Sequence, residues 1–101
     1  MLLAFSIAPS TPDEGGSYSR SVARAVRIVR ECGLPNRTDA MFTTIEGDWD
    51  ECLAVVKACV DALSQDGTRV SLVLKADIRP GYTGQLEAKV QRIEAALSVR
   101  D

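Results

Sequence analysis

Apolar and polar residues alternate along two parts of the chain. Leu3, Phe5 and Ile7 share one face of an extended backbone, and smaller side chains occupy the other face. This period of two is typical of a half-buried strand, which we predict over residues 3–8. A longer alternation predicts a second strand over residues 69–78. Each predicted strand therefore has one apolar face that needs a covering layer.

Two short segments between these strands are rich in polar and β-branched residues. They predict a strand over residues 37–41 and another over residues 43–46, separated only by Phe42. So short a separation implies a tight turn and a hairpin.

Three segments have apolar residues every three or four positions, which indicates amphipathic helices. The first helix follows Ser17 or Ser19, either of which can cap it, and ends at Gly33. Its apolar stripe is Val22, Ala25, Val26, Val29 and Cys32.

The second helix begins at Asp48, and Glu51 three residues later fits a capping box. It ends at residues 66–67. A third helix is predicted after Thr83, with an apolar stripe of Leu86, Val90, Ile93 and Leu97. The order of elements is therefore β-α-β-β-α-β-α.

This order predicts one domain over residues 1–101 in the α+β class. Without the last helix it is the ferredoxin-like βαββαβ plan, in which an antiparallel sheet of order 4-1-3-2 carries helices on one face. We expect that plan here, with an extra C-terminal helix.

The plan brings several hydroxyl and apolar side chains to one edge of the sheet. The end of the first strand, the start of the first helix and the hairpin turn meet there, which gathers Ile7, Ser17, Ser19, Phe42 and Thr43. Such groups can orient a small heterocycle within an apolar wall. The alternative is that the serines are only helix caps.

The uncovered face of the predicted sheet is small and only mildly polar. Ala4, Ser6, Ala8, Ser71 and Val73 lie on it. A single-layer sheet rarely leaves such an area exposed, so we expect this face to pack on another subunit in a homo-oligomer.

Charge and cysteine content narrow the function classes. The net charge is −2, with 12 basic and 14 acidic residues. The arginines of the first predicted helix stand at helical spacing and do not form a basic cluster. Both features disfavour nucleic-acid binding. Three cysteines and no histidine predict neither a disulfide framework nor a Cys/His metal site, and they indicate a reducing, cytoplasmic location. No segment approaches the ~20 apolar residues of a membrane helix.

The sequence also gives no sign of catalysis. Without histidine, Ser–His and Cys–His pairs are impossible, and Gly15-Gly16 does not belong to a phosphate-binding loop. We therefore predict no catalytic residues, no metal and no cofactor.

Four stretches of the chain resemble the small thiamine-binding protein family. They are residues 5–9, residues 17–28, residues 41–51 and residues 69–79, and the third is similar to the family's Met-Gly-Thr-x-Ile-Glu-Gly motif. The resemblance implies a ferredoxin-like fold, dimers that pair into tetramers, and binding of thiamine or its hydroxymethylpyrimidine part without reaction. Ser19 and Thr43 carry over best, whereas Phe42 stands where the family usually has Gly.

In the resulting hypothesis the aminopyrimidine ring exchanges hydrogen bonds with Ser17, Ser19 and Thr43. Phe42 or Ile7 supplies the apolar wall, and Glu46 is the candidate partner of thiamine's cationic thiazolium. The predicted function is that of a carrier or sensor. The alternative is an oligomeric assembly module without a small ligand, which a pocket filled by Phe42 would favour.

Overall fold

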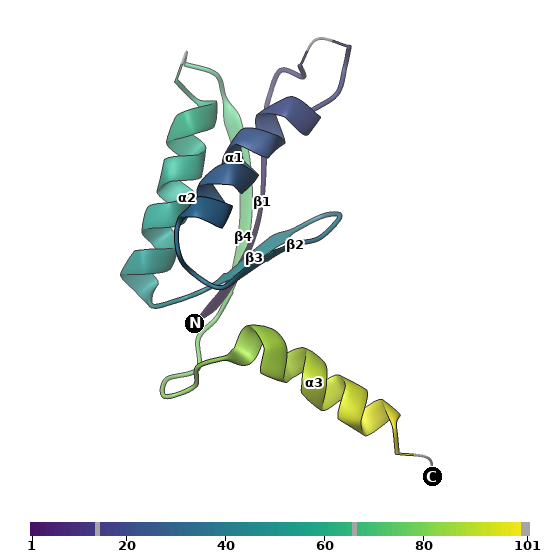
Figure 1. Cartoon of the computed structure of the whole chain (residues 1–101). Coiled ribbons are helices and arrows are strands. Elements are labelled where there is room, and N and C mark those ends of the chain that lie inside the picture. Colours follow the sequence, from purple (N-terminus) through teal and green to yellow (C-terminus); the bar gives the residue numbers. More distant parts are fainter. Residues whose placement is uncertain (14, 66, 100–101) are drawn as a thin grey trace.

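Over the residues that the structure describes, the chain folds into four strands and three helices in the predicted order (Figure 1). The computed structural model describes residues 1–13, 15–65 and 67–99. The elements are β1 (Leu2–Pro9), α1 (Ser19–Glu31), β2 (Asn36–Thr38), β3 (Thr43–Glu46), α2 (Trp49–Leu63), β4 (Val70–Asp77) and α3 (Gln85–Leu97). The predicted helix end at residues 66–67 lies partly outside the described residues.

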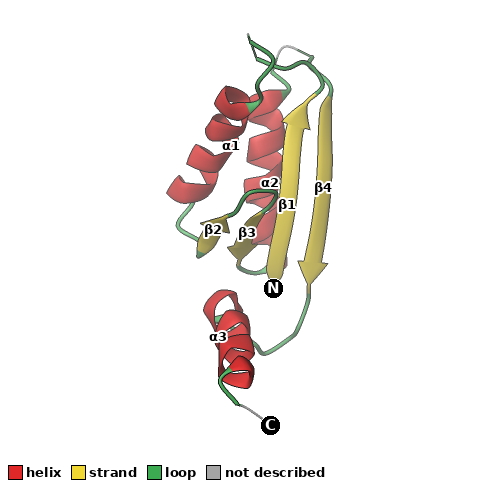
Figure 2. Ribbon diagram, turned by 90° about the vertical axis from the view of Figure 1, so that its right-hand side faces the viewer, coloured by secondary structure: helices red, strands yellow, loops and turns green. Residues whose placement is uncertain are grey.

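The four strands form one antiparallel sheet. Its order is β2-β3-β1-β4, which is the predicted order read from the other edge. Helices α1 and α2 cover one face of the sheet, and Figure 2 shows no element over the other face. The predicted α+β ferredoxin-like class with an extra C-terminal helix is confirmed.

The core lies between the sheet and the two covering helices. The alternation in β1 buries Leu3, Phe5 and Ile7. Helix α1 adds Ala25 and Val29, and α2 adds five buried side chains that include two cysteines. One of them, Cys59, is fully buried, and this burial raises the pKa of its thiol to about 11. The thiol is therefore neutral at physiological pH and behaves as a small apolar group.

Helix α2 begins with the predicted capping box. The Glu51 N–H donates to Asp48 Oδ1 at 2.8 Å, and the Asp48 N–H donates to Glu51 Oε1 at 3.1 Å. These two bonds satisfy main-chain donors that a helix start otherwise leaves free.

The start of α1 differs from its prediction. The residue at the cap position is Tyr18, which makes no capping hydrogen bond through its side chain. Instead the Asp13 carboxylate accepts from the Ser21 N–H at 3.0 Å and from the Ser21 hydroxyl at 2.5 Å. The loop before α1 thus fixes the helix, and Ser17 bonds only locally, with its oxygen accepting from the Ser19 N–H at 3.1 Å.

The β2–β3 hairpin is shorter than predicted. The strand expected over residues 37–41 ends at Thr38, and residues 39–42 form the turn. The Asp39 N–H donates to the Phe42 carbonyl at 2.9 Å and closes this turn. The hairpin therefore extends only along residues 2–5 of β1 and does not reach residues 6–8.

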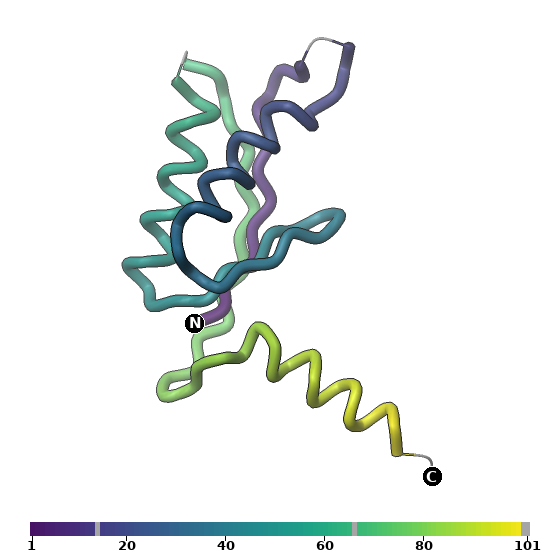
Figure 3. Tube along the Cα trace, in the orientation of Figure 1, coloured from purple at the N-terminus to yellow at the C-terminus, as the bar shows by residue number. Residues whose placement is uncertain are grey.

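Helix α3 extends away from the rest of the molecule, as the Cα trace in Figure 3 shows. It has no buried residue, and the apolar stripe predicted for it is exposed, with Ile93 at 60% and Leu97 at 70%. The molecule is accordingly elongated, with extents of 53 × 30 × 20 Å. Among the described residues, no helix has the length and apolar character to span a membrane.

Candidate functional site

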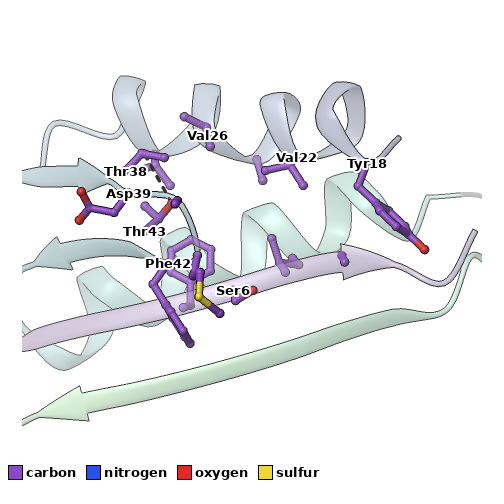
Figure 4. A pocket seen from close by; sticks show the side chains of 15 residues that line it. Ser6, Tyr18, Val22, Val26, Thr38, Asp39, Phe42 and Thr43 are labelled. Atoms are coloured by element: carbon purple, nitrogen blue, oxygen red, sulfur yellow. Dashed lines mark hydrogen bonds between the residues drawn. The ribbon is translucent and has the colours of Figure 1, made fainter. Parts of the chain in front are cut away.

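A cavity of about 250 Å³ lies between α1, β1 and the β2–β3 hairpin (Figure 4). This volume lies just below the usual range for ligand sites, roughly 300–1,000 Å³, so it suits a single ring system. Its lining residues are Phe5, Ser6, Ile7, Ala8, Tyr18, Val22, Ala25, Val26, Val29, Thr38, Asp39, Ala40, Met41, Phe42 and Thr43.

The second half of β1, residues 6–8, forms the floor of the cavity. Strand β3 pairs with β1 only from Leu2↔Glu46 to Phe5↔Thr43, whereas β4 pairs with β1 along its full length. Residues 6–8 of β1 therefore have a strand on one side only. The shortness of the hairpin opens the space beside them.

The hairpin supplies one wall. Phe42 lies at this wall and is 36% exposed, while Met41 beside it is 78% exposed. The Phe42 ring is one of the side chains that line the cavity (Figure 4), and the open volume of the cavity lies next to it. A flat aromatic face beside an open space can stack on a planar ligand.

Helix α1 supplies the opposite wall through side chains spaced one turn apart. Tyr18, Val22 and Val26 follow each other at intervals of four, so they lie along one face of the helix. Figure 4 shows all three on the helix above β1. This wall is apolar except for the tyrosine hydroxyl.

Few polar side chains reach the cavity. Thr43 is buried, and its hydroxyl donates to Thr38 Oγ1 at 3.5 Å. Asp39 is the one carboxylate among the described lining residues, and it pairs with the exposed Arg37 at 3.3 Å. Because this ion pair is exposed, the carboxylate can exchange Arg37 for another cation at little cost.

The structure brings together three of the six residues predicted for the site. Ile7, Phe42 and Thr43 all line the cavity. Ser17 and Ser19 do not line it; they are exposed and hydrogen-bond to each other through their hydroxyls at 3.0 Å.

Glu46 lies at the other end of β3 from Thr43 and does not line the cavity. It is 8% exposed, and its carboxylate accepts from the main-chain N–H groups of Gln85 at 2.8 Å and Leu86 at 3.2 Å. It therefore caps the start of α3, where a negative charge is favourable.

The surroundings of Glu46 form a second cluster of polar side chains. Asp77 pairs with Lys89, and this contact lowers the pKa of the Asp77 carboxyl. Arg79 lies 3.5 Å from the centre of the Tyr82 ring. The space enclosed between these groups is only about 10 Å³, so their side chains pack closely and hold α3. Among the described residues, no group of three or more His, Cys, Asp or Glu could hold a metal ion.

Sequence reasoning missed the helix wall and Asp39 as parts of the site. The helical spacing of Tyr18, Val22 and Val26 was readable, but it gave no sign of which apolar positions face an open space. The sequence pattern places Asp39 in a strand, and its position in the turn depends on where that strand ends.

Comparisons with known proteins point to one family. Residues 3–94 match the sequence profile of a family described as thiamine-binding protein. The UPF0045 protein Mb1933 of Mycobacterium bovis is 48% identical over 98 residues, which are 96% of this chain and 94% of that protein.

Solved structures agree on the fold. The hypothetical protein MJ1052 of Methanocaldococcus jannaschii is 31% identical, with a TM-score of 0.81 over 92% of this chain and 94% of that one. A Thermotoga maritima protein (TM0486), ascribed to thiamine biosynthesis or salvage, has a TM-score of 0.75 at 24% identity over 91% of this chain and 96% of that one. At that identity the second likeness shows the fold alone.

Proposed function

Because the chain belongs to the thiamine-binding protein family, we propose that it binds thiamine or the hydroxymethylpyrimidine part of thiamine without catalysing a reaction, as a carrier or sensor. The observation that carries the proposal is the cavity between α1 and the β2–β3 hairpin, which is mostly apolar and holds few polar groups. Such a site suits a planar heterocycle with polar atoms on its rim.

Each part of the ligand has a matching group in the cavity. The pyrimidine ring stacks on Phe42, and its polar atoms bond to the Thr43 hydroxyl. The cationic thiazolium lies toward the hairpin rim, where Asp39 supplies the negative charge. In this proposal Asp39 takes the part that the sequence suggested for Glu46, whose carboxylate is engaged by α3.

The proposed ligand-bound form is a homo-oligomer, with a tetramer of paired dimers as the assembly implied by the resemblance. Its support is the exposed apolar surface of β4 and α3, including Val73 at 57% and Ile93 at 60%. Three free thiols, two of them buried, suit a reducing cytoplasm as the place of action.

A pure assembly module is the second candidate, and the same exposed apolar surface favours it. The two candidates differ in what Phe42 does. A ring that filled the cavity would favour assembly alone, whereas open space beside the ring favours ligand binding.

Calorimetric titration with thiamine, hydroxymethylpyrimidine and thiamine diphosphate tests the proposal. We expect saturable binding of at least one of them, with one ligand per chain. No heat with any of the three, from protein whose fold is verified by circular dichroism, would overturn the proposed function and leave the assembly module.

A variant of Thr43 tests the site itself. Thr43→Val removes the hydroxyl at nearly constant volume and should weaken binding about tenfold, the effect of one lost hydrogen bond. Thr44→Val is the matched control, because Thr44 is the next residue of β3 and does not line the cavity. Equal affinities of the two variants would contradict the site. Ser19→Ala, measured alongside, tests the predicted role of Ser19, which stays a prediction.

A further inference from the structure

The hydrogen bonds at the two ends of β1 fix the direction of its main-chain groups. Met1 and Gly47 exchange two bonds: the Gly47 N–H donates to the Met1 carbonyl at 3.1 Å, and the Met1 amino group donates to the Gly47 carbonyl at 2.9 Å. At the far end the Ser10 N–H donates to the Arg69 carbonyl at 2.7 Å. Successive residues of an antiparallel strand direct these groups to opposite sides. The N–H and C=O groups of the odd-numbered residues of β1 therefore point toward β3, and those of the even-numbered residues point toward β4.

By this alternation, the N–H and C=O of Ile7 point toward the side of β3. The last pair between β1 and β3 is Phe5↔Thr43, and the same register would place Met41 opposite Ile7. Residue 41 belongs to the hairpin turn and is not in β3. Among the described residues, neither main-chain group of Ile7 has a main-chain hydrogen-bond partner on this side. Both groups thus face the cavity.

Ile7 contributes its main chain to the site, because its side chain is only 7% exposed and belongs to the core. The next residue with the same direction is Pro9, which has no N–H and cannot extend the open edge. One donor and one acceptor, side by side, are therefore available between Phe42 and the α1 wall. A cavity of about 250 Å³ between these walls is too confined for a peptide strand, so a small ring is the fitting partner.

We propose that the main chain of Ile7 reads the edge of the ligand's aminopyrimidine ring. Ring nitrogen N3 accepts from the Ile7 N–H, and the neighbouring 4-amino group donates to the Ile7 carbonyl. The ring replaces the residue that a longer β3 would have placed there, and it satisfies two groups that are costly to leave without a partner. This inference rests on the proposed function, which supplies the pyrimidine.

Amide hydrogen exchange measured by NMR tests the proposal on the unaltered protein. In the free protein the Ile7 amide should exchange much faster than the Leu3 and Phe5 amides, which bond to β3. Saturation with 4-amino-5-hydroxymethyl-2-methylpyrimidine should slow the exchange of Ile7 at least about tenfold. Calorimetric binding without slower exchange at Ile7, or an Ile7 amide already as protected as Phe5 in the free protein, would overturn this inference alone. Absence of any binding would overturn the proposed function, and this inference with it.

A pair of variants separates the main chain of Ile7 from its side chain. Ile7→Pro removes the N–H, whereas Ile7→Val alters only the side chain and keeps the N–H. Ile7→Pro should therefore bind the pyrimidine at least about tenfold more weakly than Ile7→Val does. Pro9 shows that β1 accepts proline in the same orientation. Equal affinities of the two variants would overturn the proposal.

A ligand analogue gives the same information if Ile7→Pro does not fold. The pyridine in which CH replaces N3 keeps the 4-amino group and loses the acceptor. It should bind the wild-type protein about tenfold more weakly than the pyrimidine. Equal binding of the two compounds would overturn the proposal.

Discussion

Carboxylates accept hydrogen bonds at the start of each helix in the described part of the chain. Asp13 accepts from Ser21 in α1, Asp48 caps α2, and Glu46 accepts from the first two residues of α3. The physical cause is common to all three, because a helix start exposes free N–H groups and the positive end of the helix dipole. Two of these carboxylates come from outside the helix that they cap, so they also fix the position of the helix relative to the sheet.

Asp13 makes stability depend on pH. Hydrogen bonds from the side chain and main chain of Ser21 lower the pKa of Asp13 below 3.8, so the folded state favours the charged form. The resulting stability is complete above about pH 4 and is lost as the pH falls through the lowered pKa. Asp13→Asn should therefore lower the melting temperature at pH 7, and the difference from wild type should shrink below pH 4.

Thermal unfolding followed by circular dichroism between pH 2 and pH 7 checks this prediction. Glu31→Gln is the control, because it neutralises an exposed carboxylate at the opposite end of α1 and should change little. A difference between wild type and Asp13→Asn that does not vary with pH would contradict the assigned role of the Asp13 charge.

At the scale of elements, Glu46 links β3 to α3. One end of β3 carries Thr43 in the cavity, and the other end carries Glu46 under the helix start. Since α3 has no buried residue, its position in the isolated chain depends on this carboxylate and on the Asp77–Lys89 pair.

Glu46→Gln should loosen α3 without changing the site. Glutamine keeps one acceptor oxygen but loses the charge, which should destabilise the attachment of the helix by about 1 kcal/mol. Amide exchange should rise across residues 85–97 and stay unchanged in α1 and α2. Affinity for thiamine should match that of Glu87→Gln, a control on the exposed first turn of α3. A specific loss of affinity in Glu46→Gln would restore Glu46 to the binding site.

Sequence patterns predicted the strands and helices well, because the spacing of apolar residues within one segment indicates which face of that element is buried. The capping box at Asp48 was readable for the same reason: its two partners are three residues apart. Glu46 and Leu86 are 40 residues apart, so no local pattern could pair them. The site was only partly predictable, since Thr43 and Phe42 follow from the hairpin while the free main-chain groups of Ile7 depend on where β3 stops.

At the scale of the whole molecule, the uncovered sheet face and α3 leave a large apolar surface. Val73 of β4 lies on the uncovered face and is 57% exposed, while Leu72 and Leu74 of the same edge strand are 37% and 43% exposed on the side of the helices. Ile93 and Leu97 of α3 are more exposed still. A long apolar edge strand of this kind is prone to pair with other chains unless it is covered. A second copy of the chain would cover it, which agrees with the proposed homo-oligomer.

Val73 offers a direct test of that assembly. It lies opposite Ser6 on the uncovered face of the sheet and is 57% exposed, so a lysine there can be tolerated by the isolated chain. At an interface between copies, Val73→Lys would bury charge without a partner, which is costly. We expect sedimentation velocity to show an oligomer for the wild type and a smaller species for Val73→Lys. Ala58→Lys, which adds the same charge on the exposed side of α2, should keep the wild-type assembly. A monomeric wild type at the concentrations used for calorimetry would contradict the oligomer and leave the cavity of a single chain as the complete binding unit.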